Sequence, residues 1–87
     1  MLCRIITEDK NRNGIIDLVK YRFDGFTIIE AAGYWKGQVE NSLVIEICGY
    51  FDDTMIDGVE KIAERIKVLN KQEAVLIQWL ECKSELK

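Results

Sequence analysis

The chain has 87 residues, of which 48% are hydrophobic and 31% charged, with a net charge of −3 and a pI of about 4.9. This length predicts one small domain spanning residues 1–87. The acidic balance argues against a protein that grips nucleic acid, because phosphate binding needs a basic face. No apolar run is long enough to cross a bilayer.

The cysteines and the first residues indicate a cytoplasmic protein, of a bacterium or of an infected host cell. Cys3, Cys48 and Cys82 lie far apart and form no CxxC motif. We therefore expect small, buried, reduced side chains. Met1–Thr7 is too short an apolar run for a secretion signal and leads directly into acidic residues.

Hydrophobic patterning predicts six elements in the order strand, helix, strand, strand, helix, strand. Their expected bounds are Leu2–Glu8, Asn13–Arg22, Phe26–Trp35, Ser42–Tyr50, Asp52–Asn70 and Ala74–Cys82. Asn13 is expected to cap the first helix, and Thr54 with Asp57 weakly resembles a capping box on the second. This order predicts an α+β, ferredoxin-like βαββαβ fold, in which a four-stranded antiparallel sheet carries both helices on one face.

The hairpin between Phe26 and Tyr50 determines which side chains share a face of the sheet. If Glu30 lies opposite Glu46, the small residues Ala31 and Gly33 face the helices. The other face is then apolar and needs a cover, so we expect a homo-oligomer. The side chains expected at that oligomer interface are Phe26, Ile28, Glu30, Val44, Glu46 and Tyr50.

Few residues suggest catalysis or metal binding. Glu30 and Glu46 are candidates for acid–base chemistry, but a pair of interface charges is favoured over that role. The absence of histidine excludes His-dependent triads and imidazole metal sites. Asp9–Lys20 follows a calcium-loop pattern until its twelfth position, where Lys20 replaces the bidentate glutamate. We expect a polar turn there and no metal.

The sequence GYWKGQ is the best candidate for a ligand site. Its aromatic side chains can stack on a base, and its lysine can meet a phosphate. The expected ligand-binding residues are Tyr34, Trp35, Lys36, Gly37 and Gln38, with Arg4 or Arg12 contributed by a neighbouring subunit. The alternative is that Trp35 closes the end of the core and Lys36 is solvated.

Three segments carry a resemblance to known proteins: TEDKNR, FDGFTIIEAAGYWKGQVENSLVIEI and QEAV. They resemble a family of short, uncharacterised phage and bacterial proteins. The layout is similar to the PII-like group of ferredoxin-like trimers, although the long regulatory loop of that group is missing here. The resemblance implies oligomers with ligand pockets between subunits, often for nucleotides. A phage setting would add a sponge that sequesters a host's immune nucleotide signal.

The leading hypothesis is therefore a non-catalytic, cofactor-free oligomer that binds a small nucleotide-like ligand. An interaction module that binds a host protein is the alternative. An enzyme that uses Glu30 and Glu46 ranks last, so we expect that the chain is not an enzyme.

Overall fold

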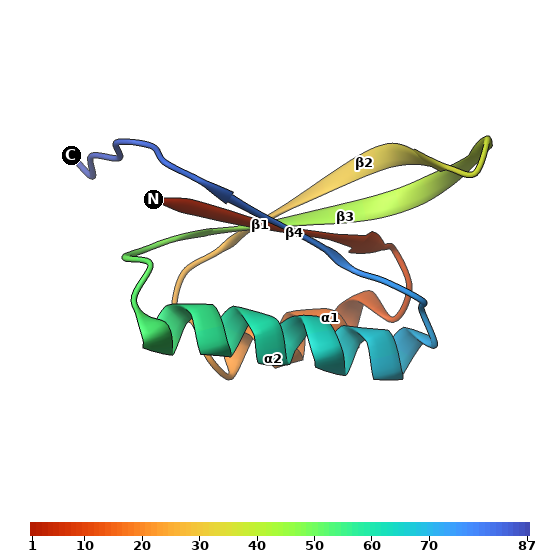
Figure 1. The fold of residues 1–87 in the computed structure, drawn as a ribbon, viewed down its shortest axis with the longest axis horizontal. Coiled ribbons are helices and arrows are strands. Elements are labelled where there is room, and N and C mark those ends of the chain that lie inside the picture. Colours follow the sequence, from red (N-terminus) through yellow and green to blue (C-terminus); the bar gives the residue numbers. More distant parts are fainter.

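A computed structural model describes residues 1–87 and shows the predicted ferredoxin-like fold. Four strands form one antiparallel sheet in the order β2-β3-β1-β4, and both helices cover one of its faces (Figure 1). The elements are β1 (Leu2–Glu8), α1 (Arg12–Lys20), β2 (Thr27–Trp35), β3 (Gln38–Cys48), α2 (Asp53–Asn70) and β4 (Leu76–Leu80).

The core lies between the sheet and the helices. Alternate residues of β1 and β3 point toward the helices and are fully buried, as a two-residue period requires. Apolar residues of α2 recur every three or four positions and pack against these buried strand residues. The eleven residues of this core are Cys3, Ile5, Ile15, Val19, Leu43, Ile45, Ile47, Met55, Val59, Ile62 and Ile66.

The helix ends differ from the predicted caps. Asp52 caps α2 by accepting a 2.8 Å hydrogen bond at Oδ1 from the Met55 backbone N–H, so the Thr54–Asp57 box is not used. Helix α1 begins one residue earlier than expected, after Asn11, which has a φ of 51° and makes no side-chain cap. The proposed cap Asn13 therefore lies inside the helix.

Side-chain amides, of which Asn70 is buried, hold the C-terminal end of α2 against the rest of the molecule. Asn70 Oδ1 accepts a 2.8 Å bond from the Asn11 side chain, and Asn70 Nδ2 donates to the Lys10 carbonyl at 3.1 Å. Gln72 Oε1 accepts from Thr7 at 2.7 Å and from Asn70 at 3.0 Å. These bonds join β1, α1 and the α2–β4 connection, and no buried side-chain polar atom lacks a partner.

The hairpin register differs from the prediction. Thr27 lies opposite Glu46 and Glu30 lies opposite Leu43, because β2 and β3 are joined by a two-residue turn instead of a six-residue loop. The shift of three residues reverses the assigned faces of β2. Phe26 and Ile28 therefore pack against the helix-side core, and Glu30 reaches Arg12 of α1. Ala31 and Gly33 consequently lie on the open face rather than under the helices.

The open face of the sheet is still largely apolar, with one ion pair near its centre. Val44 and Glu46 belong to it as expected, and Ile29, which is 41% exposed, replaces Ile28. Tyr50 lies beyond β3 in a connection. Of the cysteines only Cys3 is buried, whereas Cys48 and Cys82 are exposed, contrary to expectation. No helix is long and apolar enough to cross a membrane.

Candidate functional site

The predicted GYWKGQ site forms the end of the β2–β3 hairpin, which extends past the rest of the sheet (Figure 1). Lys36 and Gly37 make the turn, with φ angles of 51° and 77°. Lys36 Nζ lies 5.8 Å from the centre of the Trp35 ring and 3.7 Å from Glu73 Oε2. Tyr34 is 79% exposed, and Trp35 is exposed as well. The turn residues therefore lie on the surface, and Trp35 does not close the core.

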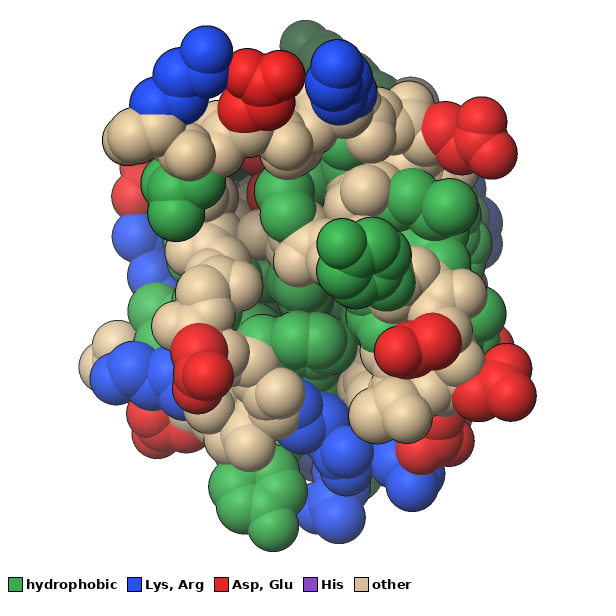
Figure 2. Space-filling view, turned by 90° about the vertical axis from the view of Figure 1, so that its left-hand side faces the viewer, with side chains coloured by type: hydrophobic (Ala, Val, Ile, Leu, Met, Phe, Trp, Pro, Cys, Tyr) green, Lys and Arg blue, Asp and Glu red, His purple; other side chains and the backbone are tan.

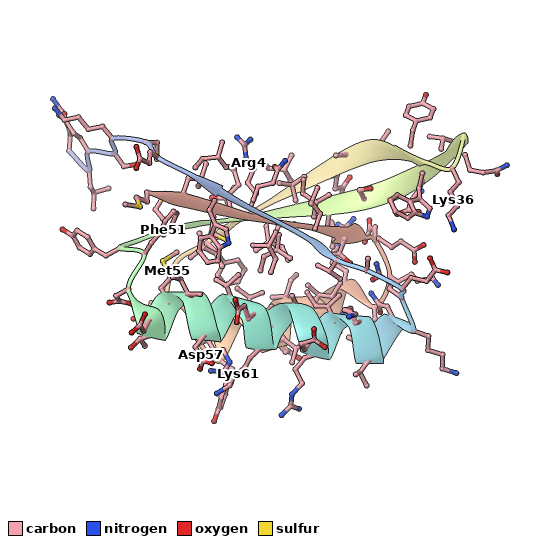
Figure 3. The ribbon with its side chains drawn as sticks, in the orientation of Figure 1. Arg4, Lys36, Phe51, Met55, Asp57 and Lys61 are labelled. Atoms are coloured by element: carbon pink, nitrogen blue, oxygen red, sulfur yellow. The ribbon has the colours of Figure 1, made fainter.

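The two arginines assigned to this site lie elsewhere in the same chain. Arg4 points from the open face of the sheet, where its Nε donates to Glu46 Oε2 at 2.8 Å (Figure 3). Its strand neighbour Glu46 lies opposite Thr27, nine residues before Lys36. At about 3.3 Å per residue, this separation is roughly 30 Å along the strand. One chain therefore cannot place Arg4 and Lys36 on the same small ligand.

Arg12 is occupied by two carboxylates at the start of α1. It binds Asp9, and its Nη1 lies 2.6 Å from Glu30 Oε1. The hydrogen bond from Arg12 lowers the pKa of Asp9, and the bonds to Asp9 and Glu30 raise the pKa of Arg12. Asp9 is thus committed to an ion pair, and the structure shows no group of three or more Asp, Glu or Cys side chains placed to hold a metal ion.

The structure does not bring Glu30 and Glu46 together. They face opposite sides of the sheet, and each pairs with a different arginine, so the expected pairing of Glu30 with Glu46 is wrong and they do not form the candidate acid–base pair. Glu8 and Glu40 form a different pair of neighbouring carboxyl groups, at the C-terminal end of β1. Partial desolvation raises the pKa of Glu40, and the neighbouring Glu8 raises it further. Glu8 in turn lies 3.4 Å from Lys10 Nζ.

A larger hollow lies at the opposite end of the molecule, where the α1–β2 and β3–α2 connections meet. Its volume is about 520 Å³, which is within the range typical of small-molecule sites. Tyr21 and Tyr50 are 85% and 89% exposed, and the Arg22 guanidinium lies 5.9 Å from the Tyr21 ring centre. The residues that line this end groove are Tyr21, Arg22, Phe23, Cys48, Gly49, Tyr50, Asp52, Thr54, Met55 and Gly58.

The end groove combines aromatic surface with two opposite charges. Figure 2 views the molecule from this end and shows hydrophobic side chains gathered across its middle, with most charged side chains toward the rim. Asp52 is the single carboxylate among the lining residues, and Arg22 is the single cation. Gly58 lies beside Phe23, and a Cβ there would meet the Phe23 ring at 3.6 Å, an ordinary van der Waals distance.

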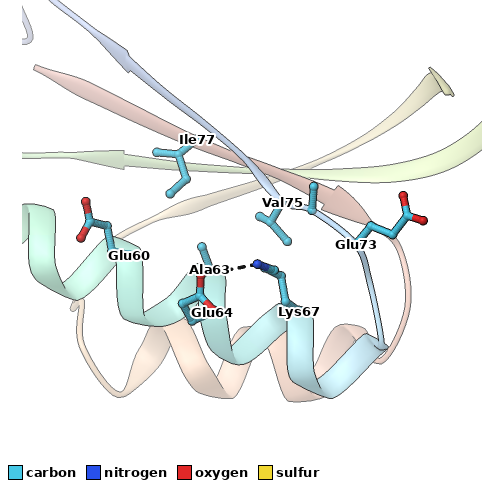
Figure 4. A pocket seen from close by; sticks show the side chains of 8 residues that line it. Glu60, Ala63, Glu64, Lys67, Glu73, Val75 and Ile77 are labelled. Carbon is cyan, nitrogen blue, oxygen red and sulfur yellow. Dashed lines mark ion pairs between the residues drawn. The ribbon is translucent and has the colours of Figure 1, made fainter. Parts of the chain in front are cut away.

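A second hollow of about 290 Å³ lies between α2 and β4 (Figure 4). Its apolar floor comprises Ala63, Val75 and Ile77. Its charged rim comprises Glu60, Glu64, Lys67 and Glu73, with Lys67 Nζ 3.6 Å from Glu64 Oε1. This hollow is smaller and has no aromatic lining. The end groove is therefore the better candidate for a small organic ligand.

No motif in the sequence indicates a ligand role for the groove residues. The sequence predicts Tyr21 and Arg22 at the end of the first helix, Tyr50 at the oligomer interface and Asp52 at the start of the second helix. The relevant signal was the topology itself. In a βαββαβ fold the first helix and the third strand finish at the same end of the sheet. The aromatic segments that follow them, YRF and GYFD, therefore come together.

Comparisons with known proteins show the fold but no family. No family model matches the chain, and neither does any curated protein. A solved phage SAM lyase in its apo state superposes with a TM-score of 0.69 at 19% identity, covering 87% of this chain and 75% of that one. A de novo designed protein, Foldit4, gives a TM-score of 0.53 at 25% identity, with 94% of each chain covered.

The first of these likenesses corrects one prediction. The sequence predicts that the chain is not an enzyme. The SAM lyase, which is an enzyme, has the same fold, so this prediction does not stand. The comparison also shows that a phage protein adopts this fold. At 19% identity it establishes the shared fold and assigns no residue.

Proposed function

We propose that this protein binds S-adenosylmethionine (SAM) in the end groove and cleaves it without adding water. The observation that carries the proposal is the lining of that groove, in which aromatic faces, one arginine and one carboxylate surround about 520 Å³. The fold shared with a phage SAM lyase supports the choice of ligand. SAM contains a nucleoside, so it is compatible with the nucleotide-like ligand expected from the sequence.

Each part of SAM has a chemical counterpart in the groove. The flat adenine and the sulfonium cation both suit the exposed faces of Tyr21 and Tyr50, by stacking and by cation–π attraction. The ligand carboxylate suits Arg22, whose planar guanidinium binds carboxylates through two parallel bonds. The ligand ammonium group suits Asp52, which pairs with no cation of its own chain.

The reaction needs little acid catalysis from the protein. When a C–S bond of a sulfonium breaks, the electron pair stays on sulfur, so a neutral thioether leaves without being protonated. The remaining fragment must then lose a proton to a base or close on a nucleophile within the ligand itself. Asp52 is the groove carboxylate available for the first route. Its Oδ1 accepts the Met55 N–H bond, which holds the side chain in place.

The test is incubation of the purified protein with SAM, followed by mass spectrometry of the products. Lyase chemistry predicts two products whose masses sum to that of SAM, whereas hydrolysis predicts a sum that is one water heavier. Unchanged SAM at high protein concentration, or a sum that includes water, would contradict the proposal.

Variants locate the site. Tyr50→Ala removes a stacking face worth on the order of 1–3 kcal/mol, so SAM binding should weaken about ten- to hundredfold. Arg22→Ala should have an effect of similar size, because it removes charge-assisted hydrogen bonds. The matched control is Tyr34→Ala, an equally exposed tyrosine at the opposite end of the molecule. If Tyr34→Ala abolishes cleavage and Tyr50→Ala does not, the site is the hairpin end.

A further inference from the structure

Strand β4 forms one edge of the sheet, and its outer side has no partner in the chain. Exposed edge strands are normally protected by charged residues or proline, because their free N–H and C=O groups attract other strands. The five residues of β4, LIQWL, include neither. Leu76 is 53% exposed, and Trp79 is also exposed. The opposite edge, β2, carries the charged Glu30.

The sequence of β4 is complementary to itself. In an antiparallel pair of two β4 strands with Gln78 on the twofold axis, Gln78 lies opposite Gln78 of the second copy. Ile77 then lies opposite Trp79, and Leu76 opposite Leu80. Every cross-strand pair on either face is therefore polar with polar or apolar with apolar, which is the arrangement that stabilises neighbouring strands.

The same register aligns opposite charges on both sides of β4. Counting outward from Gln78, Lys83 comes opposite Glu73 of the second copy. Both side chains are exposed in the single chain. Residues 81–87 form no secondary structure there, so they are available to extend the strand. Opposite charges facing each other across an antiparallel pair are favourable, and a shift of one residue would separate them.

We propose that β4 pairs with β4 of a second copy of this chain, about a twofold axis at Gln78. The dimer joins two four-stranded sheets into one continuous sheet of eight strands. This interface is isologous, since the same strand serves both partners. It is independent of the end groove, which contains no β4 residue.

Cross-linking tests the register. In a background with Cys48→Ser and Cys82→Ser, which leaves only the buried Cys3, Gln78→Cys should form a covalent dimer on oxidation. Directly opposed residues in an antiparallel pair have Cα atoms about 4.5–5.5 Å apart, within reach of a disulfide. Leu76→Cys alone should not cross-link, because Leu80 lies opposite it. The double variant Leu76→Cys with Leu80→Cys should cross-link.

Charge variants test the assembly without cross-linking. Gln78→Lys and Gln78→Glu each place like charges together on the axis, so light scattering should show half the particle mass of the parent protein. Mixing the two variants should restore the dimer mass. Circular dichroism checks that each variant is folded. A monomeric parent protein, or variants that keep the parent mass, would overturn the proposal, and so would a Leu76→Cys dimer in place of a Gln78→Cys dimer.

Discussion

At the scale of single residues, Asp52 has two separable roles. One carboxylate oxygen caps α2 at Met55, and the side chain also lines the end groove. Asp52→Asn keeps an oxygen for the cap and removes the charge. We expect this variant to bind SAM weakly and cleave it slowly, while the free energy of unfolding changes little.

The comparison with Asp52→Ala makes this prediction specific. The alanine variant loses the cap as well, so it should also lose about 0.5–2 kcal/mol of stability in urea unfolding. Cleavage by Asp52→Asn at the parent rate would remove Asp52 from the proposed chemistry and leave it a purely structural role.

Cys3 gives a prediction that depends on pH. Burial raises the pKa of its thiol from 9.0 to about 11, because the thiolate is poorly solvated in the core. The folded state therefore holds this proton more tightly than the unfolded chain. The resulting stability is fully present below pH 9 and is lost as the pH rises toward 11. Urea unfolding between pH 8 and pH 10.5 should show this loss, and Cys3→Ala should show less of it.

Alkylation provides an independent check on the same residue. Iodoacetamide at pH 8 should modify Cys48 and Cys82 in the native protein, and Cys3 only after unfolding. Rapid modification of Cys3 in the native state would mean that the first strand opens readily.

At the scale of elements, the two-residue turn determines the geometry of the hairpin. Both turn residues have positive φ, which fits a type I′ connection. Lys36→Asn should maintain or raise the melting temperature, because asparagine tolerates this conformation. Gly37→Ala should cost about 1–2 kcal/mol, because a Cβ is disfavoured there. Equal melting temperatures for both variants would contradict the turn assignment.

The Asn70 network joins β1, the start of α1 and the α2–β4 connection. Asn70→Ala removes the partner of the Asn11 amide and of the Lys10 carbonyl, both partly buried. We expect a loss of about 1–3 kcal/mol in the free energy of unfolding. Gln38→Ala, which removes an exposed amide of β3, is the control and should change stability by much less.

The order of elements could be predicted from the sequence, because each depends on a local period. Alternating residues gave β1 with its correct ends, and the apolar stripe from Met55 to Ile66 gave α2. The caps were predicted less well, since several polar residues compete at each helix start. Asp52 provides the α2 cap and Asn13 caps nothing.

At the scale of the whole molecule, the register and the end groove could not be predicted from the sequence. A period of two does not tell a two-residue turn from a six-residue loop, and an error of three residues reverses a whole strand. The end groove depends on two chain segments that meet only after folding. The hairpin end was easier to single out because its residues are consecutive in the sequence.

The adjacent residues Ile28 and Ile29 test the whole arrangement of faces. Ile28 packs against the helix-side core, and Ile29 is 41% exposed on the open face. Ile28→Lys buries a charge without a partner, so we expect it to unfold much of the protein. Ile29→Lys keeps its charge in water and should leave the monomer fold intact.

Circular dichroism and urea unfolding at low protein concentration separate the two outcomes. A domain of this size has only about 5–15 kcal/mol of stability, so a penalty of a few kcal/mol at Ile28 should be plain. Conversely, a folded Ile28→Lys and an unfolded Ile29→Lys would place Glu30 and Glu46 back on one face. That result would restore the register expected from the sequence, with Thr27, Ile29 and Ala31 turned toward the helices.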